Sequence, residues 1–503
     1  MTDKLISEDS DWSFELIERF EHELGRLAAE YRLDTYPNQL EIISSEQMMD
    51  AYAFTGLPVN YTHWSFGKNF IATEQNYRHG QMGLAYEMVI NSNPCISYLK
   101  EENTLTMQAL VIAHAAFGHN SFFKGNYLFR TWTNAEDIVD YMVFARDYVA
   151  DCERRHGEIA VERVLDACHA LMNYGVDSCR RPQHRSVACE RQRQQQREAE
   201  CEARFNDLWR TLPREATRDG HGPPLRFPAE PQENLLYFIE KQAPHLETWQ
   251  RELVRIVRKV AQYFYPQRQT KVMNEGWATF WHYTLLNRMF EEGLVNVGFM
   301  LEFLESHTSV TLQPGFGDRR YRGINPYALG FEMMRDIQRI CMKPDAEDKF
   351  WFPDIAGSDW LTTLDFAMRN FKDESFIAQF LSPRLIRQFR LFTVLDDDAR
   401  TTLAITAIHD DAGYAQVRHQ LAQQYAASTY TPDIQVHRAD LRGDRSLTLR
   451  HTRHQRQPLA GSADEVLRHA AVLWGREVRL EEVDDEGEIL KTRLVASAVV
   501  GAA

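Results

Sequence analysis

The sequence predicts a mainly α-helical fold with a short sheet, followed by a small C-terminal α+β domain. Through most of the chain, apolar residues recur at three- and four-residue spacing, which is typical of amphipathic helices. From about Arg387 the pattern changes to period two, which is typical of strands. The chain has 503 residues and 44% hydrophobic content, more than one core usually organises. We therefore expect a helical domain at 1–385 and an α+β domain at 386–503.

The first part of the body is expected to contain a helix, a loop-rich segment, a strand pair and a second helix. The apolar stripe of the first helix covers 11–31, and 51–83 is rich in aromatics, Gly, Pro and Asn. Residues 86–99 read as a strand broken by a turn at 91–94. The next helix starts with Asn103 or Thr104 as its cap and runs to His119.

The middle of the chain continues the helical pattern on both sides of a polar insertion. Helices are expected at 134–156, ending at Gly157, and at 161–175. The composition of residues 180–234 predicts an Arg/Gln/Glu helix followed by a Pro/Gly loop, and we expect a solvated insertion there. Further helices are expected over 235–264, over 274–293 and over 325–340, the last opening with Asn325 and Pro326.

The C-terminal part is expected to repeat a unit of two strands followed by a helix. The first unit has strands at 389–397 and 403–411 and a helix at 413–426. The second has strands at 434–440 and 446–452 and a helix at 463–475. Two more strands, at 476–483 and 491–498, follow it.

Charge and composition narrow the classes of function. The formal net charge is −15, whereas binding to nucleic acid phosphates requires a basic face. No apolar run approaches the ~20 residues of a membrane span, and the acidic start does not resemble an export signal. The seven cysteines are scattered without a C-x-x-C pair, as is typical of a reducing compartment. We expect a cytoplasmic protein.

The stretch QALVIAHAAFGHNSFFKGN (108–126) carries two histidines five residues apart in an apolar helix. On a regular α-helix this spacing separates two side chains by ~140°, too far for both to bind one ion. A single π-type turn would bring His114 and His119 onto one face, and such turns occur mostly at functional sites. Gly118 is a plausible place for the distortion because glycine accepts unusual backbone angles.

A third ligand for the same ion is predicted on a later helix. Glu275 lies in the apolar run MNEGWATFWHY, where an unpaired charge would be costly, and His282 lies on the same helix face. Two imidazoles, one carboxylate and an open position for water are typical of catalytic zinc. The alternative interpretation is that each is a buried polar residue with a hydrogen-bond partner.

This layout resembles the gluzincin group of zinc peptidases, in which a strand precedes a helix with two His ligands and a later helix supplies a Glu. In one bacterial branch that later helix carries Glu-Gly-Trp-Ala, as at 275–278. The resemblance implies a zincin-like helical body and zinc held by His114, His119 and Glu275. Those enzymes place the general-base Glu directly after the first His, where this chain has Ala115, so the usual water activation is in question.

Three other residues are candidates for catalysis. Glu153 or His282 would move the proton in place of the missing Glu. Glu153 also lies in a Glu-x-x-His pair with His156, a spacing found in di-iron carboxylate helices, although only one such pair is visible and a capping role is the alternative. Tyr327, at a helix start, would donate to an oxyanion, the alternative being simple packing.

The chain is identified as a member of the SpoVR family, named for stage V sporulation protein R, from seven motifs: HNSFFKGNYLFRTWT, HALMNYGVD, PQENLLYFIEK, NEGWATFWHY, INPYALGFEM, FWFPDIAGSDW and DLRGDRSLTLR. The resemblance implies a bacterial cytoplasmic protein linked to spore cortex formation or to stress responses. It also implies an AAA-type serine protein kinase and a von Willebrand A-like protein as partners.

Two functions therefore remain open on the sequence. The first is a metal-dependent hydrolase, with zinc as cofactor, that acts on a peptide or amide bond. The second is a non-enzymatic regulatory partner of the kinase system on a zincin-like scaffold, which Ala115 favours.

Overall fold

The structure is a computed structural model of the chain. It describes residues 5–8, 10–53, 57, 59–68, 71, 87–177, 192, 232–315, 318–391, 394–395, 404–405, 410–426, 431–453, 458–484 and 486–495. The predicted insertion at 180–234 lies almost entirely outside the described residues, as does much of the loop-rich segment at 51–83.

A helix and a three-stranded sheet open the body. Helix α1 (Phe14–Glu30) begins at Ser13, whose side chain accepts from the Leu16 amide, and it buries the apolar stripe that the sequence predicted. The sheet has the order β1-β3-β2, with β1 parallel and β2 antiparallel to β3. Its strands are β1 (Asn38–Ile43), β2 (Glu87–Ile90) and β3 (Cys95–Lys100), and α2 (Ser45–Ala53) follows β1. The predicted strand broken by a turn is thus the β2–β3 pair.

The histidine-bearing helix follows the sheet directly. Thr104 caps α4 (Leu105–Val111) by accepting from the Met107 amide. The chain then passes without a break through η1 (Ile112–His119) into α5 (Asn120–Gly125). The next elements are α6 (Tyr127–Trp132), α7 (Ile138–His156), α8 (Glu158–Ala170), the 3-10 turn η2 (Met172–Tyr174) and the short pair β4 (Val176–Asp177) and β5 (Gln232–Glu233).

The single helix expected over 235–264 is wrong, because the structure has two helices there. Helix α10 (Leu235–Gln242) ends before Pro244, and α11 (Thr248–Gln269) begins anew with a capping box between Glu247 and Gln250. Pro244 lacks the N–H that a continuing helix would bond to the carbonyl of Glu240, which favours a break here, and the Glu247 cap starts the next helix.

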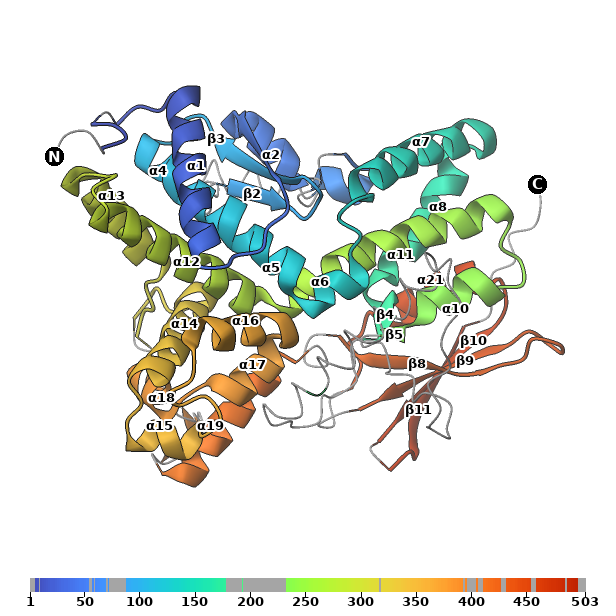
Figure 1. Cartoon of the computed structure of the whole chain (residues 1–503). Helices are drawn as coiled ribbons and strands as arrows, with labels where there is room; N and C mark the ends of the chain where they lie inside the picture. The colour runs from blue at the N-terminus through green and yellow to red at the C-terminus, as the bar shows by residue number, and fades with distance from the viewer. Residues whose placement is uncertain are drawn as a thin grey trace, which may run out of the picture.

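Helix α12 (Lys271–Glu291) is the centre of the helical body. Its first half packs in a core with α5, α14 and α16–α19, while its second half packs in another core with α1, α4, η1 and α13. The surrounding helices are α13 (Val297–Val310), α14 (Pro326–Met342), α15 (Ala346–Trp351), α16 (Trp360–Asn370), α17 (Asp373–Phe380) and α18 (Pro383–Gln388). Figure 1 shows α12 running between the N-terminal sheet and the α14–α18 group.

The C-terminal part contains both predicted units of two strands and a helix. The first has the short pair β6 (Val394–Leu395) and β7 (Ala404–Ile405) and then α19 (Asp411–Gln424); the second has β8 (Asp433–Ala439), β9 (Leu447–Thr452) and α21 (Ala463–Trp474). Strands β10 (Val478–Val483) and β11 (Ile489–Val495) complete a sheet of order β11-β10-β9-β8, in which β9 and β10 are parallel. In Figure 1 this sheet lies beside α10 and α21, away from α12. The fold is mainly α with short sheets, as predicted.

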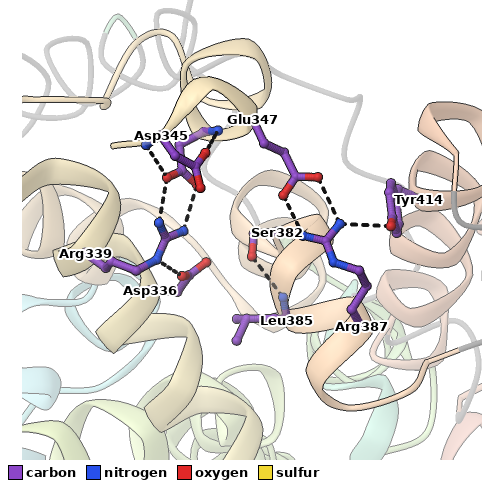
Figure 2. Close-up of polar contacts among 9 residues, drawn as sticks. Asp336, Arg339, Asp345, Glu347, Ser382, Leu385, Arg387 and Tyr414 are labelled. Carbon is purple, nitrogen blue, oxygen red and sulfur yellow. Dashed lines mark hydrogen bonds and ion pairs between the residues drawn. The ribbon is translucent and has the colours of Figure 1, made fainter. Parts of the chain in front are cut away.

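The two units pack in different places. Helix α21 packs with α7, α8, α10 and α11 in one core, whereas α19 packs against α17 and α18. Figure 2 shows how α19 is held: Arg387 donates to both carboxylate oxygens of Glu347 and to the Tyr414 hydroxyl at 2.6–2.9 Å. Bidentate pairs of this kind fix orientation as well as distance.

Candidate functional site

The two histidines lie on one side of a π-helical segment. Residues Ile112–His119 form π-helix η1, and the rings of His114 and His119 have their centroids 4.7 Å apart. The predicted π-type turn is therefore confirmed, and it covers eight residues. The i to i+5 repeat of this helix matches the spacing of the two histidines, which explains why their rings meet.

Gly118 has a different role from the one expected. The described glycines with a positive φ lie elsewhere, so Gly118 does not relieve a strained backbone. A Cβ atom on Gly118 would instead lie 2.6 Å from the Cα of Ala278 and 2.8 Å from its Cβ. Glycine is needed because η1 and α12 touch at this point, and this close contact sets the distance between the histidines and α12.

Two carboxylates flank the histidine pair from opposite elements. On α12, Glu275 places Oε2 3.6 Å from His119 Nε2 and 3.8 Å from His114 Nε2. On β2, Glu87 places Oε1 3.2 Å from His114 Nε2. The imidazole side chains are 5% and 9% exposed and the carboxylates 19–20% exposed. The site is thus largely withdrawn from water, with the carboxylates its most accessible part.

Several polar atoms of this cluster are buried without a hydrogen-bond partner: His114 Nε2, Glu275 Oε2 and Glu87 Oε2. Buried polar atoms are rarely left unsatisfied, and each one costs free energy. A four-coordinate zinc with bonds of about 2.1 Å separates its ligand atoms by about 3.4 Å, close to the 3.6 and 3.8 Å measured here. Glu87, His114 and His119 likewise each offer an atom within 4.8 Å of the others. The residues present therefore fit a divalent metal.

Each histidine is oriented through its other ring nitrogen. His119 Nδ1 lies 2.9 Å from Asn274 Oδ1, which only accepts, so Nδ1 carries the proton and the lone pair of Nε2 faces Glu275. His114 Nδ1 lies 2.8 Å from His282 Nδ1, and His282 Nε2 lies 2.9 Å from His307 Nδ1. Metal-binding histidines are commonly held in this way.

The electrostatics of the site separate the two carboxylates. Burial raises the pKa of Glu87 to about 7. The nearby His114 acts to lower this pKa, and the nearby Glu275 acts to raise it. Burial also acts to raise the pKa of Glu275, but His114, His119 and Tyr327 outweigh it and lower that pKa. Glu275 is therefore ionised at neutral pH, while Glu87 titrates near neutrality.

The histidines also differ. Burial and the nearby His114 lower the pKa of His119 to about 4. Burial acts in the same direction on His114, but Glu87 and Glu275 outweigh it and raise its pKa. Burial lowers the pKa of His282 well below its usual value, so this residue is neutral.

The four residues of the motif Glu275 to Ala278 each contact a different part of the structure. Glu275 faces the histidines, and a Cβ on Gly276 would collide with the backbone of Gly330, so α14 lies directly against α12. Trp277 Nε1 donates to Ser121 Oγ at 2.9 Å, and Ala278 touches Gly118. The motif is thus the packing junction of α12 with α14, α5 and η1.

Tyr327 lies beside the cluster, at the start of α14. The Asn325 side chain caps this helix by accepting from the Tyr327 amide at 3.0 Å. The ring of Tyr327 is nearly parallel to that of His114 at 6.5 Å, and its side chain contributes to the low pKa of Glu275. Five predicted site residues, His114, His119, Glu275, His282 and Tyr327, are therefore brought together.

Glu153 is not part of this cluster. It lies near the end of α7, which packs against α8 and α11, and burial, Glu158 and Glu162 raise its pKa. Its neighbour in the Glu-x-x-His pair, His156, stacks on Trp249 at 4.3 Å. No described contact links Glu153 to the histidines, so the structure does not support Glu153 as the base.

Sequence reasoning missed two members of the cluster, Glu87 and His307. The signal for Glu87 was a carboxylate inside the strand just before the histidine helix, in YEMVI. The signal for His307 was its place on the apolar face of VGFMLEFLESHTSV, with Phe299, Met300 and Phe303.

None of the described helices combines the length and apolarity needed to cross a membrane.

Comparison with known proteins gives a consistent assignment. The family model "SpoVR like protein" matches residues 11–430, and "SpoVR-like C-terminal domain" matches 432–485. The chain is 61% identical over 484 residues to "Uncharacterized protein YcgB" of Escherichia coli (strain K12), covering 96% of this chain and 95% of that protein. No solved structure matches the chain. The family matches span nearly the whole sequence, and the chain therefore belongs to the SpoVR family.

Proposed function

We propose that this SpoVR-family protein is a zinc-dependent hydrolase of a peptide or amide bond, acting in a bacterial stress response or in spore cortex formation. The observation that carries the proposal is the convergence of His114 Nε2, His119 Nε2 and Glu275 Oε2 within 3.6–3.8 Å contacts in a buried site. Two of these atoms have no hydrogen-bond partner. A bound cation would satisfy both.

His114, His119 and Glu275 would hold the metal. When bound, zinc would lower the pKa of a coordinated water and polarise the carbonyl of the substrate. Asn274 and His282 keep the two imidazoles oriented with Nε2 toward Glu275. Tyr327, whose side chain helps to lower the pKa of Glu275, would donate a hydrogen bond to a developing oxyanion.

Glu87 would take the proton that the Glu of a usual zinc peptidase takes. Ala115 is fully buried and carries no acid, whereas Glu87 brings a carboxylate from β2 to within 3.2 Å of His114 Nε2. This replaces the earlier candidates. Glu153 lies in another helix pair, and both ring nitrogens of His282 are occupied by His114 and His307. His282 therefore orients His114 rather than moving a substrate proton.

The metal assignment is tested by measuring bound metal in the native full-length protein by mass spectrometry. We expect about one zinc per chain, lost in the His114→Ala His119→Ala variant and weakened in Glu275→Gln, which preserves side-chain volume. His156→Ala, at an exposed histidine of α7, is the matched control and should retain the metal. A metal-free native protein whose stability is unaffected by zinc or a chelator would contradict the assignment.

The role of Glu87 is tested by Glu87→Gln. If Glu87 is the base, Glu87→Gln should retain nearly all of the metal. It should lose the chelator-sensitive hydrolysis of a peptide library. If Glu87→Gln instead loses the metal as Glu275→Gln does, Glu87 is a ligand and the proposed base is wrong. A native protein that holds zinc but cleaves no peptide or amide in the library would count against hydrolysis.

A second candidate function is that of a non-enzymatic regulatory partner of a serine protein kinase system. Ala115 favours it, because the helix that carries both histidines has an apolar methyl group in place of the usual base. Binding of the purified AAA-type kinase, measured with the native protein and with Glu275→Gln, would distinguish the two. If the protein is a regulatory partner, the kinase should bind the native protein and Glu275→Gln equally well, because this function does not need the metal.

A further inference from the structure

A second group of polar side chains joins the segment after α2 to helix α8. It consists of His63, Ser65 and Asp166. Tyr61 and Phe66, from the same segment, pack in the core that α7, α8, α10 and α11 form. The helices of the metal site, η1 and α12, belong to the other two large cores. The group is therefore held by a different part of the fold from the candidate metal site.

The three side chains form a continuous series of hydrogen bonds. Ser65 Oγ lies 2.7 Å from His63 Nδ1, and His63 Nε2 lies 3.1 Å from Asp166 Oδ1. The His63 side chain is 1% exposed and the Asp166 side chain 32% exposed, whereas Ser65 is half-buried. A serine at the surface is thus bonded to a buried imidazole, and that imidazole is bonded to a carboxylate.

The protons of this series have one arrangement. The backbone N–H of Ser65, which can only donate, lies 3.3 Å from His63 Nδ1, so Nδ1 carries the lone pair. His63 Nε2 therefore carries the ring proton and donates it to Asp166, and the Ser65 hydroxyl donates to Nδ1. Burial lowers the pKa of His63, although Asp166 and Glu162 act to raise it. The ring is neutral at pH 7 and can accept a proton from Ser65.

Neighbouring side chains hold both the carboxylate and the imidazole. Trp64 Nε1 donates to Asp166 Oδ1 at 2.6 Å. His169, on the same helix as Asp166, stacks on the His63 ring with the centroids 4.1 Å apart and the planes 18° from parallel. Burial raises the pKa of Tyr61, so its hydroxyl keeps the proton and donates it to His169 Nε2 at 2.7 Å. The His63 ring is therefore held in one orientation, as a general base must be.

A helix cap explains only part of this arrangement. Residues 64–68 are helical, and the bond from the Ser65 amide to His63 Nδ1 is the bond that a cap provides. A cap does not require the hydroxyl of Ser65 on the same nitrogen. It also does not require a carboxylate from α8 on the opposite nitrogen of the ring.

We infer that Ser65 is a nucleophile for acyl transfer from a carboxylic ester, with His63 as its general base and Asp166 as the residue that positions His63. A serine, an imidazole and a carboxylate bonded in this order activate the hydroxyl group on several unrelated folds. This activity goes beyond the metal-dependent hydrolysis proposed above, because it uses none of the residues of the metal site.

The reaction has two stages. Ser65 Oγ forms a bond to the carbonyl carbon of the ester while its proton passes to His63 Nδ1. The bond from that carbon to the ester oxygen breaks, and the alcohol leaves with the proton from His63. A water molecule then attacks the acyl group on Ser65 and gives a proton to His63, which returns it to Ser65 Oγ as the carboxylic acid leaves. Asp166 stabilises the positive charge that His63 carries in each stage.

The inference is tested on the full-length protein with a fluorophosphonate probe and with p-nitrophenyl acetate, and peptide mass spectrometry locates the modified residue. We expect both reagents to modify Ser65, and neither to modify that position in Ser65→Ala. Ser309→Ala is the matched control, since Ser309 is an exposed serine that donates to the Ser306 carbonyl, and it should leave the modification of Ser65 unchanged. Failure of either reagent to modify Ser65 in the native protein would overturn the inference.

Asp166→Asn tests the positioning role, because the amide oxygen can still accept from His63 and Trp64 while the negative charge is lost. We expect the fluorophosphonate to modify Ser65 about a hundredfold more slowly or worse, since this exchange lowers the rate of a serine protease by about 10⁴. Asp147→Asn, at an exposed aspartate of α7, is the matched control and should react at the native rate. An Asp166→Asn variant that unfolds like the native protein and reacts at the native rate would reduce the arrangement to a helix cap.

The candidate metal site is separated from this one by two further measurements. The chelator-treated native protein and the His114→Ala His119→Ala variant should both be modified at Ser65 at the native rate. This result is independent of whether the protein binds zinc, so it can hold even where the metal assignment fails. Modification of Ser65 that requires the metal or the two histidines would overturn the inference of a separate site.

Discussion

The Nδ1 atoms of His114 and His282 lie 2.8 Å apart, and neither ring is more than 5% exposed. One of the two nitrogens must carry a proton and the other must accept it. If His114 Nε2 binds a metal, its proton sits on Nδ1, so His282 accepts there and donates from Nε2 to His307. A metal would thus set the direction of a three-histidine chain that runs from η1 through α12 to α13.

The first prediction is that His282→Phe weakens metal binding about 10- to 100-fold, the usual effect of losing a partner that orients a ligand. The ring volume is largely kept, but His114 Nδ1 loses its acceptor. The dissociation constant is measured by competition with a chelator of known affinity. His307→Phe, one step further along the series of hydrogen-bonded histidines, should weaken metal binding less. An effect of His307→Phe that equals or exceeds that of His282→Phe would contradict this order.

The second prediction concerns acid stability. Burial, with Arg335 and His114, lowers the pKa of His307 to about 4 from 6.5. Between these values the unfolded chain binds the proton and the folded chain does not, so stability is full above pH 6.5 and is lost as the pH falls toward 4. The difference between these two pKa values corresponds to roughly 3 kcal/mol for this residue.

The measurement is the free energy of unfolding of the metal-free protein in urea at pH 7, 5.5 and 4.5. His307→Gln cannot titrate in this range, and it should therefore lose less stability between pH 7 and 4.5 than the native protein does. His119, with a pKa of about 4, contributes in the same direction, so part of the pH dependence remains. Identical pH dependence in the variant and the native protein would show that His307 does not titrate as expected.

The parts of the site that local geometry determines could be predicted from the sequence. Two ligands five residues apart cannot share one face of an α-helix, so the histidine spacing predicted the π-type turn that η1 provides. A charged residue in an apolar run is costly, and this identified Glu275 as a candidate. Glu87 could not be found in this way, because a Glu in an alternating strand is normally read as facing solvent. What turns it toward His114 is the packing of the sheet on η1, which depends on tertiary contacts.

The helix boundaries show the same limit. The periodic pattern over 235–264 continues through Pro244, but the structure starts a new helix at the Glu247 cap. Gly118 shows it again, since its role is to admit Ala278 of a helix more than 150 residues away in sequence. The local sequence pattern indicates where an unusual residue is needed, but the residue that it contacts is determined by the tertiary fold.

The third prediction is that Gly118→Ala destabilises the protein by about 1–3 kcal/mol, as overpacking of a close contact does. The new Cβ would lie 2.6 Å from the Cα of Ala278, so η1 must move away from α12 and the metal affinity should fall as well. Unfolding and metal binding are both measured. Gly67→Ala is the control, since Gly67 is an exposed helical glycine with nothing within 4 Å of the added methyl, and it should be neutral or stabilising by up to about 1 kcal/mol.

Adding Ala278→Gly removes the methyl group that lies 2.8 Å from the new Cβ, but the backbone contact remains. The double variant should therefore recover part, and not all, of the lost stability. Full additivity of the two substitutions would contradict a direct contact between η1 and α12 at this point.

The last prediction concerns the hydrogen bond between Trp277 and Ser121, which joins α12 to α5. Trp277 Nε1 donates to Ser121 Oγ, and Ser121 Oγ donates to the carbonyl of Gly118, each at 2.9 Å. Ser121→Ala leaves a buried indole N–H unsatisfied and should cost about 1–3 kcal/mol. Trp277→Phe removes the donor and leaves Ser121 its bond to Gly118, but it also shrinks a buried side chain, so its cost is set by the cavity that remains. In the double variant both partners are gone, so the sum of the single effects should overestimate the loss measured by urea unfolding.

Because Gly118 precedes His119, Ser121→Ala should also weaken metal binding. A variant with lower stability but native metal affinity would show that the bond supports the fold without acting on the site.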